Sequence, residues 1–399
     1  MSEWKRYKLG ELLSIKHGWA FKSENYVKDS KTALVTLRNI SEDSRFVFDA
    51  HKTTYYGGEY PEEYNLNEGD LIIPLTEQVV GLLGNSAFVP NLSDIKFVLN
   101  QRVGKVQEKY EKIDKIFLKY LLSTTIVRTQ MEYRASGTKQ RNISPKDIYD
   151  IEVYIPELVT QKHIGRILYN LDKKIQINNQ INQELEAMAK TLYDYWFVQF
   201  DFPDQNGKPY KSSGGKMVYN PELKREIPEG WGVKKVGELQ IATGKRDANF
   251  GTENGQYDFW TTANSPIKAD EFSFEGKAIL IAGNGNFYVN FTEGKFEAYQ
   301  RTYVIQSEDE NMLIFMYMAC LQSVEKLRKG SNGSIIKYIT IGDVNNIASP
   351  YNKKVVNEFV RIYSPLIDLI SKNKRQNQEL TQLRDWLLPM LMNGQVKVE

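Results

Sequence analysis

The chain has 399 residues, of which 41% are hydrophobic and 26% are charged, and its formal net charge is +2. This length predicts two or three domains, and the near balance of charge means that any DNA binding needs local basic patches or a partner. The longest apolar run, residues 313–321, is less than half of a membrane span, and the N-terminus lacks a signal-peptide core. One cysteine, Cys320, excludes an internal disulfide and favours a reducing, cytoplasmic location.

The first block of the chain, residues 1–156, has mixed character. Short β-rich runs such as DLIIPL (residues 70–75) end at Gly, Pro or Asn, and residues 117–133 have a helical pattern. A second block, residues 231–350, repeats these features in the same order. Its opening at Trp231 with Gly237-Glu238-Leu239 corresponds to Trp4 with Gly10-Glu11-Leu12. We therefore expect two related α+β domains.

A long heptad stretch follows each block, at residues 157–199 and 351–393. Both stretches contain the string NQEL, and in both the apolar steps of three and four residues are interrupted by polar residues near the middle. This periodicity predicts a coiled coil, although it fits a parallel or an antiparallel pair, and two unrelated amphipathic helices remain an alternative. The predicted seam consists of Leu168, Leu171, Ile175, Asn178, Asn182 and Leu185 in the first helix and of Leu366, Leu369, Asn373, Leu380 and Leu383 in the second. We expect the polar centres, Asn178 and Asn182 with Asn373 and Asn377, to face one another at a pseudo-twofold axis.

Residues 200–230, between the first helix and the second block, are rich in Gly, Pro, Ser and Lys. This composition predicts a linker rather than a further domain.

Signatures of catalysis are missing from the sequence. No Gly-Lys pair is followed by Ser or Thr, no GxGxxG opens a helix, and the only Asn-Pro, at residues 220–221, lacks the second proline and aromatic residue of an amino-methyltransferase site. Three scattered histidines and one cysteine do not form the usual zinc spacings. The sequence therefore predicts no catalytic residues and no metal site.

Polar, glycine-rich loops in both blocks are candidates for DNA contact, because Arg, Lys, Asn and Gln pair with base edges and phosphates. The candidate residues are Lys22, Arg38, Asn39, Lys139, Gln140, Arg141 and Asn142 in the first block and Lys245, Arg246, Asn284, Asn286, Asn332 and Lys337 in the second. The alternative is that these residues are solvated turns. We expect the recurring pairs Gln101-Arg102 and Gln300-Arg301 to lie in apolar strands and to have a structural role.

The segments LYDYWFVQFDFPDQNGKPYKSSGGKMVYNPELKREIPEGW (residues 192–231) and NQELTQLRDWLLPMLMNGQVKV (residues 377–398) resemble the specificity subunits of type I restriction–modification systems. The resemblance extends over essentially the whole chain. It implies an α+β protein in which two target recognition domains are separated by two long helices packed as an antiparallel coiled coil, with a pseudo-twofold repeat. The implied domains are target recognition domain 1 (1–156), spacer helix 1 (157–199), the linker (200–230), target recognition domain 2 (231–350) and spacer helix 2 (351–393).

The resemblance also implies the function and the partners. Each domain would recognise one half of an asymmetric bipartite site in double-stranded DNA, and the helices would set the spacer and bind two methyltransferase subunits, which restriction subunits join. This chain would bind no cofactor, and S-adenosylmethionine, ATP and magnesium would belong to the partners. From the short apolar runs, we expect no membrane partner. Two alternatives are a coiled-coil scaffold without sequence-specific DNA contact and an orphan specificity subunit that serves a methyltransferase only.

Overall fold

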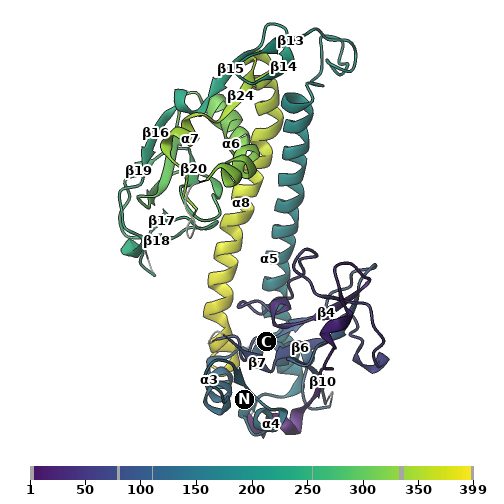
Figure 1. Cartoon of the computed structure of the whole chain (residues 1–399). Helices are drawn as coiled ribbons and strands as arrows, with labels where there is room; N and C mark the ends of the chain where they lie inside the picture. The colour runs from purple at the N-terminus through teal and green to yellow at the C-terminus, as the bar shows by residue number, and fades with distance from the viewer. Residues whose placement is uncertain (1–3, 79–80, 110, 254, 332–336, 397–399) are drawn as a thin grey trace. The chain divides into compact units, whose positions relative to one another are not determined.

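The structure, a computed structural model, describes residues 4–78, 81–109, 111–253, 255–331 and 337–396 (Figure 1). The chain divides into two compact units. Unit 1 consists of residues 1–177 and 376–399, and unit 2 consists of residues 178–375. Each unit therefore contains one mixed α/β lobe and a part of each long helix, and unit 2 is inserted in the sequence of unit 1.

The lobe of unit 1 is built on two four-stranded sheets. The first sheet is entirely antiparallel, and its order is β2 (Leu13–His17), β10 (Val103–Glu108), β6 (Leu71–Pro74) and β8 (Ala87–Phe88). The second has the order β3 (Tyr26–Val27), β5 (Tyr55–Tyr56), β4 (Thr32–Val35) and β9 (Lys96–Leu99), and β4 and β9 are parallel. The lobe also contains the pairs β1 (Lys5–Lys8) with β12 (Glu152–Ile155) and β7 (Thr76–Glu77) with β11 (Arg141–Asn142), and the helices α1 (Leu9–Leu12), α2 (Lys115–Leu122), α3 (Thr125–Arg134) and α4 (Pro145–Tyr149).

The lobe of unit 2 repeats this plan. Its antiparallel sheet has the order β16 (Gln240–Thr243), β23 (Thr302–Gln306), β20 (Ala278–Ala282) and β21 (Val289–Thr292). Its second sheet has the order β18 (Ile267–Ala269), β17 (Tyr257–Trp260), β22 (Lys295–Ala298) and β19 (Phe274–Glu275), with β17 and β22 parallel. The unit also contains β15 (Gly232–Lys235) paired with β24 (Ala348–Tyr351), and the helices α6 (Glu310–Gly330) and α7 (Ile341–Asn345). A hairpin of β13 (Met217–Asn220) and β14 (Arg225–Pro228) lies in the segment expected to be a linker.

The central strands β6 and β20 are buried on both faces. Alternate side chains of a strand point to opposite sides of the sheet, and in these strands both sides are covered by other residues. In β6, Leu71 and Ile73 belong to the core beneath α2, whereas Ile72 packs with the second sheet. In β20, Ile279 belongs to the core around α6 and Leu280 to the opposite cluster. Continuous apolar runs at residues 71–73 and 278–282 thus produce the same layered lobe twice.

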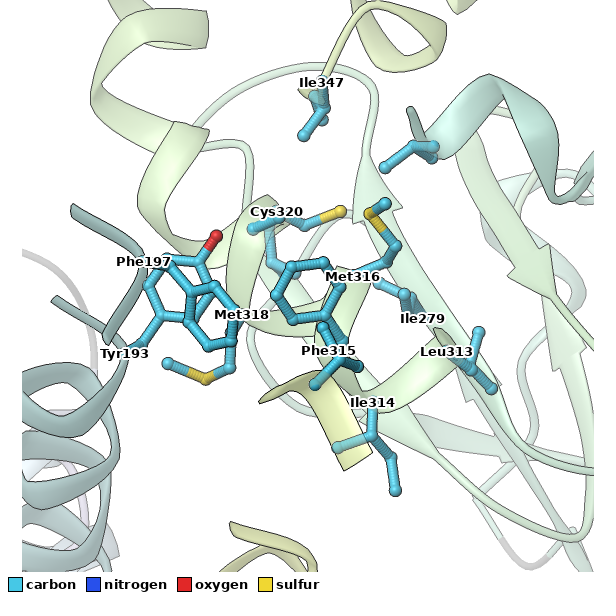
Figure 2. Packing of buried hydrophobic residues seen from close by; sticks show 14 of the residues in the cluster. Tyr193, Phe197, Ile279, Leu313, Ile314, Phe315, Met316, Met318, Cys320 and Ile347 are labelled. Carbon is cyan, nitrogen blue, oxygen red and sulfur yellow. The ribbon is translucent and has the colours of Figure 1, made fainter. Parts of the chain in front are cut away.

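Aromatic and aliphatic side chains join the lobe of unit 2 to the end of α5 (Leu158–Tyr193), which continues as a π-helical turn (Asp194–Val198). Figure 2 shows Tyr193 and Phe197 beside the α6 side chains Phe315 and Met318. The ring centroids of Phe197 and Phe315 are 4.8 Å apart, and the Tyr193 hydroxyl lies 2.7 Å from Oγ of Ser349. This buried cluster fixes the lobe on the helix.

Helix α5 and helix α8 (Lys353–Met392) run antiparallel inside each unit. In unit 1, Arg384 of α8 donates to Asp172 of α5, and the earlier α5 residue Leu168 shares a core cluster with the later α8 residue Leu391. In unit 2, Asn373 donates to Asn182, and the ring of Phe197 lies 5.2 Å from that of Phe359. Contacts that advance along α5 go backwards along α8, so the direction that periodicity left open is antiparallel in both units.

The seam on α8 differs from the expected one at alternate positions. Leu369 and Leu383 are 41% and 43% exposed, and their places are taken by Ile370 and Arg384. The seam assignment of Leu369 and Leu383 is therefore corrected by one residue each. The other expected seam residues are buried or half-buried: Leu168, Leu171, Ile175, Asn178, Asn182, Leu185, Leu366, Asn373 and Leu380. Among the described residues, no helix has the length and apolar character needed to cross a membrane.

Candidate nucleic-acid interface

Several polar loops of unit 1 meet at one end of its antiparallel sheet, where β6, β7 and β10 lie together (Figure 1). Four segments reach this end of the sheet: the C-terminal end of β2, the turn between β9 and β10, the C-terminal end of β6, and strand β11. Backbone hydrogen bonds join them, since the N–H of Leu75 donates to the carbonyl of Arg102 and the N–H of Ile143 donates to the carbonyl of Leu75. We call this set the sheet-end loops.

The centre of the sheet-end loops in unit 1 is the turn that presents Gln101 and Arg102. The N–H of Val103 closes the turn on the carbonyl of Asn100 at 2.9 Å, and the N–H of Gln101 donates to the carbonyl of Trp19 at 3.0 Å. Both Gln101 and Arg102 are exposed. The backbone is thus fixed on each side while the side chains project into solvent.

Unit 2 has the same arrangement around Gln300 and Arg301. The N–H of Thr302 donates to the carbonyl of Tyr299 at 2.8 Å, and the N–H of Gln300 donates to the carbonyl of Arg246 at 2.9 Å. The N–H of Gly283, at the end of β20, donates to the carbonyl of Arg301 at 2.7 Å. The turns of the two lobes therefore have matching hydrogen-bond partners.

A glycine next to each turn allows this close approach. A Cβ atom added at Gly18 would lie 2.1 Å from the carbonyl oxygen of Asn100, and one added at Gly244 would lie 2.1 Å from that of Tyr299. Neither distance leaves room for a side chain. Glycine is thus required at both positions for the neighbouring strand to lock the turn.

The expectation that the two Gln-Arg pairs lie in strands is wrong. Both pairs are exposed turn residues at the sheet end. No Gly or Pro marks either turn, and apolar residues flank both pairs, so local composition favoured a strand. The recurrence of the same dipeptide in both halves was the signal that could have revealed them.

Among the candidates of unit 1, Gln140, Arg141 and Asn142 lie in the sheet-end loops. Asn142 accepts a hydrogen bond from the Thr76 hydroxyl at 2.9 Å, and Nε2 of Gln140 donates to the same amide oxygen at 3.2 Å. Lys139 precedes them in the same loop and is exposed. This loop therefore carries polar groups next to the Gln101–Arg102 turn.

Arg141 is committed to an ion pair with a buried carboxylate. Its Nη1 lies 3.0 Å from Oε1 of Glu77, whose side chain is 1% exposed. The other oxygen of Glu77 accepts the backbone N–H groups of residues 81, 82 and 83 at 3.1 to 3.2 Å. Because Arg141 balances this buried charge, the pair orders the loop, and the guanidinium is less available for DNA.

The other candidates of unit 1 lie around the second sheet. Arg38 is exposed after β4, whose Val35 carbonyl accepts the N–H of Asn100, so Arg38 follows a strand that ends beside the turn. Asn39 is 6% exposed, and its amide is used by the backbone of Thr36 and Val47. Lys22 is exposed, 3.9 Å from Glu24, and no contact joins it to the sheet-end loops of the described chain.

The candidates of unit 2 gather at the equivalent sheet end. Lys245 and Arg246 follow β16, and the backbone of Asn284 pairs with that of Tyr338, next to the exposed Lys337. Asn286 is exposed in the same loop. Asn332 lies outside the described residues.

Arg246 repeats the pattern of a paired arginine. Its Nε lies 3.3 Å from the carboxylate of Glu297, which is fully buried, and its Nη2 lies 2.6 Å from Glu271. The remaining cations of the sheet ends form no ion pair within the described parts of the chain. These residues are Arg38, Arg102 and Lys139 in unit 1 and Lys245, Arg301 and Lys337 in unit 2.

A charged cluster ties the lobe of unit 1 to both helices. The carboxylate of Asp172 on α5 accepts three hydrogen bonds, from Nζ of Lys119 at 2.9 Å, from the hydroxyl of Tyr120 at 2.7 Å and from Nη1 of Arg384 at 2.9 Å. Burial by itself would raise the pKa of Asp172, but Lys119, Arg384 and Tyr120 together hold this pKa below its usual range. Burial lowers the pKa of Lys119 despite its carboxylate partner.

The described residues include no group of three or more His, Cys, Asp or Glu side chains arranged to hold a metal ion. The arrangement that the structure does provide is non-covalent: exposed cations and amides on a rigid sheet end, repeated in both lobes. Such groups can bind anions and base edges.

Two lobes of one topology, each with sheet-end loops and a share of an antiparallel helical seam, define a duplicated binding protein. The family model described as "Type I restriction modification DNA specificity domain" matches residues 1–187 and 228–382. The chain therefore belongs to this family of type I restriction–modification specificity proteins.

Individual relatives share only moderate identity with the chain. It is 34% identical over 186 residues to the type I restriction enzyme EcoDI specificity subunit of Escherichia coli, a match that spans 44% of this chain and 40% of that protein. It is 26% identical over 312 residues to the MjaIX specificity subunit of Methanocaldococcus jannaschii, which covers 71% of this chain and 69% of that protein. The crystal structure of the S subunit from M. genitalium has the same fold, with a TM-score of 0.62, 16% identity and coverage of 98% and 96% of the two chains.

Proposed function

We propose that this chain is the DNA-recognition subunit of a type I restriction–modification complex, in which each lobe recognises one half of an asymmetric bipartite site. The observation that carries the proposal is the repeated sheet end, with exposed cations and amides at equivalent loops of both lobes. Family membership supports DNA as the target.

The two half-sites differ because the loops beside the shared turn differ. Thr76 and Asn142 face each other in unit 1, where unit 2 has Asn284 and Tyr338. Different hydrogen-bond donors and acceptors recognise different base edges in the major groove. The bipartite site is therefore asymmetric.

The helices act as the spacer between the half-sites. Helix α5 is 36 residues long, which corresponds to about 54 Å at 1.5 Å per residue. This length supports a gap of fixed size between two short recognised sequences, because a helix transmits a fixed length as a flexible linker does not.

Two methyltransferase subunits bind the helices, and restriction subunits join that complex. Exposed apolar residues on α8 support this part of the proposal: Ile362 and Leu369 in unit 2, and Leu383 and Trp386 in unit 1. Apolar side chains repeated along an exposed helix face favour a protein partner. S-adenosylmethionine, ATP and magnesium act in these partners, and this chain contributes recognition only.

Domain exchange tests the proposal. Residues 1–155 are replaced by the corresponding domain of another specificity subunit, the chain is co-expressed with its methyltransferase, and the methylated motif is determined by methylome sequencing. We expect one half-site of the methylated motif to change, while the other half-site and the spacer length stay the same. Exchange of residues 231–350 is the matched experiment and alters the opposite half. A change in both halves from either exchange contradicts the assignment, and a chain that yields no motif at all favours a scaffold without DNA contact.

A further inference from the structure

The two lobes share one exposed dipeptide at one place in the fold. Gln101-Arg102 follows β9 in unit 1, and Gln300-Arg301 follows β22 in unit 2. Each of these two strands belongs to the second sheet of its lobe and pairs in parallel with a neighbouring strand. Each pair precedes a strand at the middle of the antiparallel sheet. The two positions are therefore structurally equivalent.

The backbone of the dipeptide is held equally firmly in both lobes. The carbonyl of Arg102 accepts the N–H of Leu75 at 2.9 Å, and the carbonyl of Arg301 accepts the N–H of Gly283 at 2.7 Å. Across the other side, the N–H of Gly18 donates to Val103 and that of Gly244 to Thr302, at 3.2 and 3.0 Å. A turn whose backbone is fixed from both sides loses little further backbone entropy when its side chains bind a ligand.

The side chains of the dipeptide are not held by polar contacts within the described residues. Gln101, Arg102, Gln300 and Arg301 are all exposed, and within the described residues none of these side chains takes part in a hydrogen bond or an ion pair. By contrast, the neighbouring Arg141 and Arg246 are paired with buried carboxylates. The shared arginines thus combine a fixed backbone with a guanidinium that forms no hydrogen bond or ion pair within the described residues.

The residues around the shared dipeptide differ between the lobes. The loop that receives the Gln N–H presents Trp19 in unit 1 and Arg246 in unit 2. Thr76 and Asn142 in unit 1 correspond to Asn284 and Tyr338 in unit 2. A side chain that is the same in both lobes cannot distinguish two different half-sites, whereas the variable neighbours can.

We propose that the Gln101–Arg102 and Gln300–Arg301 turns bind the phosphates of the DNA backbone, one turn in each half-site, irrespective of base sequence. This inference rests on the proposed function. The sugar–phosphate backbone is the part of DNA that any two half-sites have in common. A guanidinium donates two parallel N–H groups to a phosphate, and the glutamine amide adds a neutral donor beside it.

The test compares Arg102→Ala, Arg301→Ala and the double variant with the wild-type chain, each in complex with its methyltransferase. Fluorescence anisotropy measures affinity for a cognate and a non-cognate duplex over a series of salt concentrations, and methylome sequencing reports the motif. Lys28→Ala is the matched control, because Lys28 is an exposed cation of unit 1 outside the sheet-end loops. Thermal melting of each variant checks that the fold is kept.

Each single variant lowers affinity for both duplexes by a similar factor, and the slope of log K against log salt becomes less negative by about 0.9 for each phosphate that the chain no longer neutralises. The double variant changes the slope by about twice that amount, Lys28→Ala keeps the wild-type slope, and all motifs stay the same. Arg102→Lys retains most of the slope, since a lysine still neutralises a phosphate.

Three results overturn the inference: a changed base in either half-site, a loss of affinity confined to the cognate duplex, or an unchanged salt slope. The first two would assign the turn to base recognition. If the wild-type complex itself gives no bipartite motif and no preference between the duplexes, the proposed function fails, and the inference fails with it.

Discussion

Nδ2 of Asn373 donates to Oδ1 of Asn182 at 2.9 Å, and both side chains are buried in the seam of unit 2, at 8% and 5% exposure. Nδ2 of Asn182 in turn reaches the carbonyl of Ile370 at 3.5 Å. A buried amide pair in an apolar seam is satisfied in one register only, so it selects the alignment of the helices at a cost in stability.

Replacing one asparagine tests this role. Asn182→Ala leaves the Asn373 amide buried without its acceptor and destabilises unit 2 by about 1–3 kcal/mol. Urea denaturation of the full chain measures the loss of stability. We expect the double variant Asn182→Leu with Asn373→Leu to be at least as stable as the wild-type chain, because two apolar groups replace two hydrogen-bonded polar ones. A double variant as unstable as the single one would contradict the role of the amide pair.

The Asp172 cluster makes the stability of unit 1 sensitive to acid. The pKa of Asp172 is lower in the folded chain than the unfolded value of about 3.9. The ion pairs of Asp172 therefore contribute fully to the stability of the fold above the unfolded pKa. This contribution disappears as the pH falls through the lower pKa of the folded chain. We expect Asp172→Asn to be markedly less stable than wild type at pH 7, and the difference to shrink in acid below the unfolded pKa. Denaturant titrations over a pH series measure it, and a difference that is independent of pH would exclude a titrating Asp172.

Shortening both helices by one heptad tests the spacer. Removing residues 176–182 and 373–379 deletes matched segments, because Asn182 and Asn373 pair, and keeps the phase of the seam. The helical path shortens by about 10 Å, equivalent to about three base pairs. Methylome sequencing then shows both half-sites unchanged and a shorter gap. An unchanged gap would mean that the helices do not set the spacer.

Removing an exposed apolar side chain from α8 tests the partner surface. Trp386 is 56% exposed, so Trp386→Ala leaves the stability of the chain within about 0.5 kcal/mol. We expect weaker assembly with the methyltransferase, measured by sedimentation velocity. Tyr133→Ala is the control, because Tyr133 is an 89% exposed aromatic residue on a different helix, α3. Equal assembly of Trp386→Ala and wild type would remove Trp386 from the partner surface.

The sequence predicted the repeat, the α+β lobes and the helical pair because these depend on periodicity and order along the chain. The sequence placed Leu383 in the α8 seam instead of Arg384, because periodicity favours an apolar leucine over a charged arginine at a buried position. Arg384 is nevertheless half-buried, since Asp172 on another helix neutralises it. Periodicity contains no information about such a tertiary ion pair.

Individual DNA-contact candidates were harder to predict for the same reason. Arg141 and Arg246 look like free cations in the sequence, but Glu77 and Glu297, distant along the chain, are paired with them in the structure. The exposed Arg102 looked like a strand residue because apolar residues stand on both sides. Residue type and spacing located the loops, whereas only the fold shows which side chains are already used.

The division of the chain has a consequence for biosynthesis. The core of unit 1 includes Leu391 and Met392, which are made after all of unit 2. Unit 2 is continuous in sequence, so it completes its core while unit 1 still exposes the apolar surface that α8 will cover. In a nascent chain, domains usually fold in order from the N-terminus. Here the part of the protein that begins first is finished last, and full recognition of both half-sites has to wait for the final helix.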